Sequence, residues 1–194
     1  GYCCNDDRHR DRLKHMIEEF YNKTQHAVVT PQNTDKFIDT HRAWSTHHNV
    51  TLQWDFLELF SGAGRLSASG HALGLRVGPP IDYRYGWDIA NTDHQKKLNK
   101  LIAYFRPTVV HGAMDCRVWS IANTTGEPQQ KAKERQQASQ HLAWINDLCF
   151  TQDRRGRAFI LENPLASAIW TKSPLQPLTE KFGKQRCDQC MLGL

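Results

Sequence analysis

Apolar residues recur at every third or fourth position in two segments near the start of the chain, residues 8–24 and 34–44. This spacing predicts two amphipathic helices, with a break at Thr30-Pro31 between them. Neither segment carries a catalytic signature. Residues 1–50 are therefore predicted to form a helical extension, either an accessory lid or the end of a preceding domain.

From residue 51 onward, short apolar runs alternate with longer segments of helical periodicity. The apolar runs predict strands over residues 54–60, 75–81, 108–113 and 158–161. The helical patterns lie over residues 65–73, 94–105 and 129–150. Strands that alternate with helices favour a mostly parallel sheet with helices on both faces. The predicted fold class is α/β and Rossmann-like, with residues 51–194 as one core domain.

Composition narrows the class of protein. Hydrophobic residues make up 39% of the chain, and no apolar run approaches the roughly 18 residues that a membrane span requires. The N-terminal residues are polar and charged, unlike a secretion signal. We therefore expect a soluble, intracellular protein without a membrane partner, in the nucleus or the cytoplasm.

Charge and cysteine content add less. The net charge of +5 permits a polyanionic partner without establishing one. The charged run over residues 131–135 is expected to be a solvated helix face, and it would also fit a contact with phosphate. The chain is large for a disulfide scaffold, so its six cysteines are expected to be reduced. Cys187 and Cys190 have zinc-knuckle spacing, but adjacent Cys3-Cys4 is a poor second half-site, and no metal is predicted.

The most informative segment is a glycine turn between the first predicted strand and the helix after it. It reads Asp55-Phe56-Leu57-Glu58-Leu59-Phe60-Ser61-Gly62-Ala63-Gly64. Glycine lets the backbone turn tightly and approach a ligand at the sheet edge where ligands bind. The turn alone would equally fit a structural connection. However, Asp82 ends the next predicted strand, where a carboxylate can accept hydrogen bonds from both ribose hydroxyls.

The turn departs from the fingerprint of dinucleotide sites. Ser67 stands where the third glycine of G-x-G-x-x-G is expected. A nucleoside cofactor without a pyrophosphate therefore fits better, which favours S-adenosylmethionine over NAD.

The same segments resemble the cytosine-C5 methyltransferases of nucleic acids. The turn is similar to their first motif, D-L-F-S-G-x-G-G, with Glu58 in place of Asp and Arg65 in place of the last glycine. Ile81-Asp82 resembles the ribose-binding motif, and Trp87-Asp88-Ile89 resembles the motif whose Asp faces the adenine amino group. Asp88 would equally fit a turn or cap residue. The resemblance implies a cofactor site formed by Glu58, Phe60, Ser61, Gly62, Gly64, Asp82 and Asp88.

The segment after the third predicted strand resembles the catalytic loop of that family, P-C-Q-x-F-S-x-A. It reads Met114-Asp115-Cys116-Arg117-Val118-Trp119-Ser120-Ile121-Ala122. The resemblance implies that the Cys116 thiolate adds to carbon 6 of cytosine, so that carbon 5 can attack the methyl sulfonium. Ser120 matches the family's serine. Asp115 replaces its proline and would disfavour a neighbouring thiolate, or handle protons itself. Outside the motif, Cys116 would fit a small buried hydrophobe.

Phe159-Ile160-Leu161-Glu162-Asn163-Pro164 resembles the E-N-V motif of the same family. The resemblance implies that Glu162 hydrogen-bonds the cytosine edge and promotes protonation of its N3 atom. Asn163 is expected to brace the loop. In isolation the segment would also fit a polar strand end before a proline.

The resemblance covers residues 55–164, a little over half of the chain, and includes no target-recognition domain. The chain also resembles, more loosely, the methyltransferase-like domains of retroelement or viral polyproteins. This second resemblance implies that other domains of a polyprotein would be its partners. Three functions stay open: cytosine-C5 methylation of DNA or RNA, amino (N4/N6) methylation that uses Asp115, and a non-catalytic module that binds a cofactor or partner.

Overall fold

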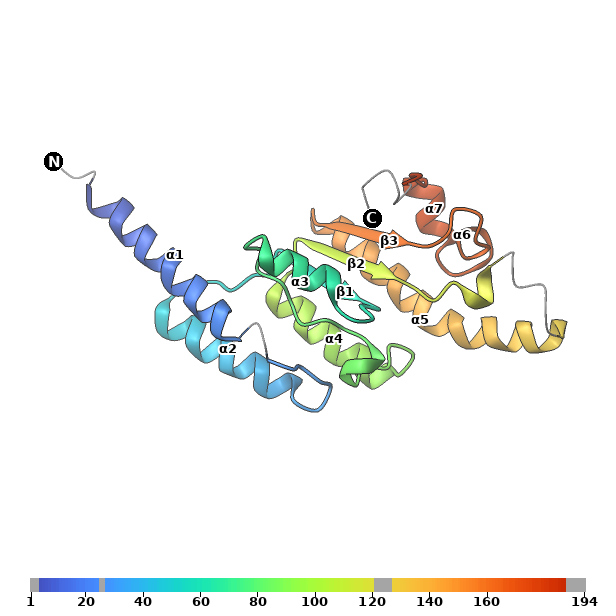
Figure 1. Cartoon of the computed structure of the whole chain (residues 1–194), viewed down its shortest axis with the longest axis horizontal. Coiled ribbons are helices and arrows are strands. Elements are labelled where there is room, and N and C mark those ends of the chain that lie inside the picture. Colours follow the sequence, from blue (N-terminus) through green and yellow to red (C-terminus); the bar gives the residue numbers. More distant parts are fainter. Residues whose placement is uncertain (1–3, 25–26, 121–126, 188–194) are drawn as a thin grey trace.

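The computed structural model describes residues 4–24, 27–120 and 127–187. Within these residues it is an α/β structure, in which a three-stranded parallel sheet lies among seven α-helices (Figure 1). The predicted α/β class is therefore confirmed. The N-terminal helices are also present, at one end of the molecule.

The sheet has the strand order β1-β2-β3, with β1 at Phe56–Leu59, β2 at Val109–Ala113 and β3 at Ala158–Glu162. The helices are α1 (Cys4–Thr24), α2 (Thr34–His48), α3 (Arg65–Ala72), α4 (Thr92–Phe105), α5 (Pro128–Arg154), α6 (Ile169–Lys172) and α7 (Gln176–Phe182). Two 3₁₀ turns, η1 (Tyr83–Tyr85) and η2 (Arg117–Trp119), follow the sheet edge. Because all strands run in the same direction, their carboxyl ends lie at one edge.

The segment 75–81, predicted as a strand, does not form one. It runs parallel to β1 but meets it in two isolated bridges. Pro79 and Pro80 lack an amide hydrogen, so a continuous ladder of hydrogen bonds cannot form. The end of the segment is still held, because the amide of Ile81 donates to the carbonyl of Glu58 at 3.0 Å. The residue after it is thereby placed beside the end of β1.

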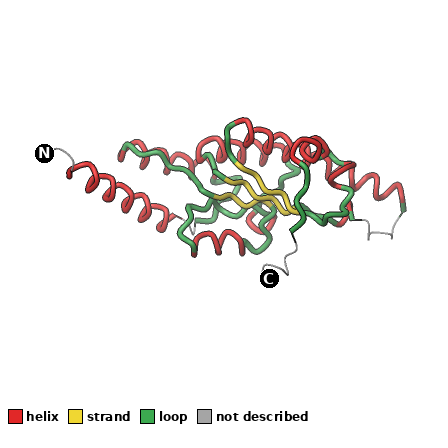
Figure 2. Tube along the Cα trace, turned by 90° about the horizontal axis from the view of Figure 1, so that it is seen from above, coloured by secondary structure: helices red, strands yellow, loops and turns green. Residues whose placement is uncertain are grey.

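Helices flank the sheet on both sides, as Figure 2 shows. Helix α3 packs on β1, and α5 packs on β3. The core between the strands and α5 is apolar: Leu57, Leu59, Leu142 and Ile145 are fully buried. Burying each such side chain contributes about 1.5–3 kcal/mol to folding. This core positions the carboxyl edge of the sheet.

Aromatic side chains join the N-terminal helices to the core. Phe20 of α1 stacks on Trp44 of α2, with ring centroids 4.2 Å apart. Phe37 of α2 contacts Phe105 of α4, whose ring stacks on Trp54 at 4.0 Å. The two predicted N-terminal helices are thus confirmed: α1 packs on α2, and α2 packs against α4. None of the helices in the described part of the chain is long and apolar enough to cross a bilayer.

His41 makes the stability of this helical region depend on pH. Its side chain is buried among Phe20, Phe37 and Phe105, and its Nδ1 atom lies 2.8 Å from the carbonyl of Phe37. Burial lowers the pKa of His41, and the hydrogen bond to Phe37 only partly opposes this shift. His41 is therefore protonated less readily in the folded chain than in the unfolded chain.

We expect the free energy of unfolding to fall as the pH drops below about 6.5, where unfolded histidine becomes protonated. Replacing His41 with phenylalanine should make this fall shallower, because the buried titrating group is gone. Chemical denaturation between pH 7 and 5 measures the slope. Replacing the exposed His47 with phenylalanine is the matched control and should leave the slope unchanged. Equal slopes for all three chains would contradict the prediction.

Candidate functional site

The glycine turn after β1 has a backbone that few side chains tolerate. Phe60, Gly62 and Gly64 all have positive φ angles, of 54°, 54° and 67°. A Cβ atom added at Gly62 would meet no atom within 4 Å, so open space lies beside the backbone there. A Cβ atom at Gly64 would come within 3.3 Å of Pro80. The first glycine therefore leaves room for a ligand, and the second allows close packing.

Asp82 ties this turn to the next segment. Its Oδ2 atom accepts a hydrogen bond from the amide of Gly62 at 2.9 Å, and its Oδ1 atom accepts one from the amide of Arg84 at 3.1 Å. Each carboxylate oxygen can accept further hydrogen bonds. The side chain is therefore oriented by the backbone and retains capacity for the hydroxyls of a ligand.

Glu58 has a structural partner. Its side chain is buried, and its Oε2 atom accepts hydrogen bonds from the amide of Ser67 at 2.9 Å and from its hydroxyl at 2.6 Å. A carboxylate at this position satisfies a free amide in the first turn of α3 and complements the helix dipole. Ser61 is also buried, and its hydroxyl has no hydrogen-bond partner among the described residues.

Asp88 caps a turn. Its Oδ1 atom accepts hydrogen bonds from the hydroxyl of Tyr83 and the amide of Ala90, both at 2.9 Å. Its own amide donates to Nδ1 of His94 at 2.9 Å. These contacts agree with the interpretation of Asp88 as a turn residue, and they hold Ile89 and Ala90 at the sheet edge.

A cleft of about 840 Å³ opens at the carboxyl edge of the sheet. Its lining includes Phe60, Asp82, Ala90, Asp115, Val118 and His141. The glycine turn, the loop after β2 and helix α5 thus meet around one space. Its size lies within the range of small-molecule and cofactor sites.

Arg117 holds the carboxylate of Asp115 at this cleft. The amide of Arg117 donates to Oδ1 at 2.9 Å, and its Nε atom donates to Oδ2 at 2.8 Å. These hydrogen bonds hold the pKa of Asp115 below its usual value, against the opposing effect of partial burial. The negative charge next to Cys116 is thus paired with a guanidinium, which sequence reasoning did not foresee.

Cys116 is half-buried and immediately precedes η2. Its carbonyl accepts a hydrogen bond from the amide of Trp119 at 3.1 Å, which shapes the loop. Its neighbours Asp115 and Arg117 line the cleft, whereas Cys116 is not among the lining residues. Ser120 follows in an extended conformation. The last two motif positions, 121 and 122, lie outside the described residues.

Glu162 ends β3 in register with Ala113, the last residue of β2. Its carboxylate is about half exposed, and its Oε2 atom lies 3.7 Å from Nε2 of His111. The next residue, Asn163, donates from Nδ2 to the carbonyl of Met114 at 2.9 Å. This bond braces the loop after β3 against the loop after β2, as predicted. Glu162 therefore lies at the end of β3, and the loop that contains Cys116 follows the neighbouring strand β2.

Helix α5 contributes His141 to the lining of the cleft, and its Arg135, in the charged run predicted as a solvated face or a phosphate contact, bonds the loop after β2. Arg135 is half-buried, and its Nε atom donates to the carbonyl of Val118 at 2.9 Å. His141 lies with its ring 5.8 Å from that of Phe60, and burial lowers its pKa. The spacing of Glu134, Ala138 and His141 by four and three positions places them on one helix face. This spacing was the signal from which the contribution of α5 to the site could have been predicted.

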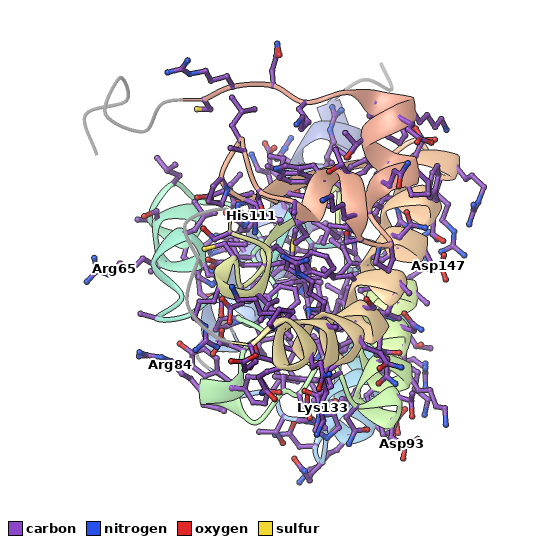
Figure 3. The ribbon with its side chains drawn as sticks, turned by 90° about the vertical axis from the view of Figure 1, so that its right-hand side faces the viewer. Arg65, Arg84, Asp93, His111, Lys133 and Asp147 are labelled. Carbon is purple, nitrogen blue, oxygen red and sulfur yellow. The ribbon has the colours of Figure 1, made fainter. Side chains whose placement is uncertain are left out.

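Figure 3 contrasts inner and outer side chains near the site. Arg65 and Arg84 project outward, whereas His111 lies among the inner side chains. The Nδ1 atom of His111 is buried without a hydrogen-bond partner among the described residues.

The structure does not bring metal ligands together within the described ranges 4–24, 27–120 and 127–187. No group of three or more His, Cys, Asp or Glu side chains there could hold a metal ion. Cys187 is exposed, and Cys3 and Cys190 lie outside the described residues.

Comparisons with protein-family models, with curated proteins and with solved structures found no match for this chain.

Proposed function

We propose that this chain binds S-adenosylmethionine at the carboxyl edge of its sheet and is the Rossmann-like catalytic core of a class I methyltransferase. One observation carries the proposal: the Asp82 carboxylate, which lines the cleft, accepts a 2.9 Å hydrogen bond from the amide of Gly62, and open space lies beside that glycine. A glycine turn and an acidic side chain on adjacent segments form the usual arrangement for holding a ribose.

The electrostatics of α3 favour this cofactor over a dinucleotide. A pyrophosphate would bind at the free amides of the helix N-terminus. In this chain the buried Glu58 carboxylate already accepts the amide of Ser67 there. A pyrophosphate would meet this negative charge, whereas the sulfonium and ammonium groups of S-adenosylmethionine are positive.

The acceptor chemistry that we propose is methylation of carbon 5 of cytosine in DNA or RNA. The Cys116 thiolate adds to carbon 6, and carbon 5 then attacks the methyl group and releases S-adenosylhomocysteine. Loss of the proton from carbon 5 expels the thiolate and restores the ring. The 2.9 Å bond between Asn163 and Met114 supports this mechanism, because it holds the Glu162 loop against the Cys116 loop.

Methylation of an exocyclic amine is the second candidate. Asp115 and His141 both line the cleft, and Cys116 is not among its lining residues. Burial lowers the pKa of His141, which favours the neutral imidazole that can accept a proton. In this mechanism Asp115 accepts a hydrogen bond from the amine as its nitrogen attacks the methyl group and releases S-adenosylhomocysteine. The methylated nitrogen then gives its extra proton to His141.

Isothermal titration calorimetry tests the cofactor proposal. We expect S-adenosylmethionine and S-adenosylhomocysteine to bind with one-to-one stoichiometry, and NAD to bind far more weakly because of its pyrophosphate. Binding of NAD without binding of either methionine-derived ligand would contradict the proposal.

A further inference from the structure

Three arginines gather at the amino-terminal edge of the sheet, opposite the cleft. Arg106 directly follows α4. Arg155 and Arg157 flank Gly156 in the turn between α5 and β3. Both turns precede strands that pair in parallel, so they lie at the same edge.

Gln152 joins these two turns. Its Nε2 atom donates to the carbonyl of Pro107 at 3.0 Å and to that of Ala158 at 3.2 Å. Its own carbonyl accepts the amide of Arg157 at 2.9 Å. Gln152 is fully buried, which makes this connection a fixed part of the fold. The turn at Arg106 and the turn at Arg157 are therefore held side by side.

The positive charge of this cluster is not compensated by the described residues. The Nε and both Nη atoms of Arg157 are buried and have no hydrogen-bond partner there. Burial lowers the pKa of Arg157, and repulsion from Arg155 and Arg106 lowers it further. Asp153, the acidic residue beside this turn, is engaged by Lys181 at 2.8 Å.

A buried guanidinium without an acceptor costs free energy, and such groups are normally paired with an anion. Guanidinium groups match the oxygens of phosphate in geometry as well as charge. Arg106 and Arg155 are exposed and can reach a ligand from solvent. We propose that Arg106, Arg155 and Arg157 form a binding site for an oxyanion of the phosphate type.

Two sources can supply this chemistry: the backbone of a nucleic acid or a free phosphate. The first arm of the experiment compares thermal unfolding of the full chain in sodium phosphate and in sodium chloride of equal ionic strength. The second arm measures binding of a fluorescent single-stranded oligonucleotide by anisotropy. Both arms are repeated with Arg155→Gln, Arg157→Gln and Arg106→Gln. Arg154→Gln is the matched control, because it removes the same charge from an exposed neighbour.

We expect phosphate to raise the melting temperature more than chloride does, and the apparent phosphate affinity to fall about tenfold or more in the cluster variants. The control should stay within about twofold of the unsubstituted chain. Loss of oligonucleotide binding in the same variants identifies a nucleic-acid backbone, and unchanged oligonucleotide binding identifies a free phosphate. Equal melting temperatures in the two salts would overturn the proposal. An equal loss of phosphate affinity in Arg154→Gln and in the cluster variants would also overturn it. Binding of S-adenosylmethionine should not change in any variant.

Discussion

Replacing Cys116 with serine should abolish the covalent adduct that we expect between this chain and a nucleic acid containing 5-fluorocytosine. In the proposed mechanism the thiolate adds to carbon 6, and carbon 5 takes the methyl group. Fluorine at carbon 5 cannot leave as a proton, so the thioether persists. A serine hydroxyl is a far weaker nucleophile, because its pKa lies well above that of a thiol. Denaturing electrophoresis with S-adenosylmethionine present detects the adduct as a shifted band.

The controls separate the nucleophile from the rest of the chain. Cys187→Ser alters an exposed cysteine and should leave the adduct intact. Glu162→Gln should slow adduct formation, because the base would lose its proton partner. Cys116→Ser should retain affinity for S-adenosylmethionine, since the thiol acts on the base. Methyl transfer to an amine without any adduct would exclude the carbon 5 mechanism and favour the mechanism based on Asp115.

Replacing Asp82 with alanine should weaken binding of S-adenosylmethionine by roughly 10- to 150-fold. The estimate corresponds to about 1.5–3 kcal/mol for the loss of hydrogen bonds from ribose hydroxyls to a charged acceptor. The variant also removes the 2.9 Å hydrogen bond that the Gly62 amide donates to Asp82, so the glycine turn is held less firmly. Calorimetric titration with S-adenosylmethionine and S-adenosylhomocysteine measures the effect.

Two variants make this result specific. Asp82→Asn keeps a side-chain oxygen that can accept one amide hydrogen bond but removes the charge. Its affinity for S-adenosylmethionine should therefore fall less than that of Asp82→Ala. Asp93→Ala removes the same charge from an exposed carboxylate that pairs with Lys96, and it should leave binding unchanged. Unaltered affinity in Asp82→Ala would mean that another group holds the ribose.

The positions of helices α1 to α5 and of three of the four predicted strands followed from local patterns, whereas the short helices α6 and α7 were not predicted. Helical periodicity and apolar runs are properties of neighbouring residues, so they can be read without knowledge of distant contacts. The error at residues 75–81 had a local cause too. Pro79 and Pro80 interrupt the hydrogen bonding to β1, and the apolar pattern outweighed them in the prediction.

The sequence by itself determined the order of the candidate site residues along the chain and the strands that Asp115 and Glu162 follow or end. The carboxyl ends of parallel strands lie together, so these two residues come to the same edge. Asp82 follows segment 75–81, which is not a strand, and it reaches this edge because the amide of Ile81 donates to the carbonyl of Glu58. Only the tertiary structure decided which partners these side chains meet. Glu58 turns to Ser67, and α5 contributes His141 to the cleft. Such contacts join segments that are remote in sequence, so their geometry depends on how the helices pack against the sheet.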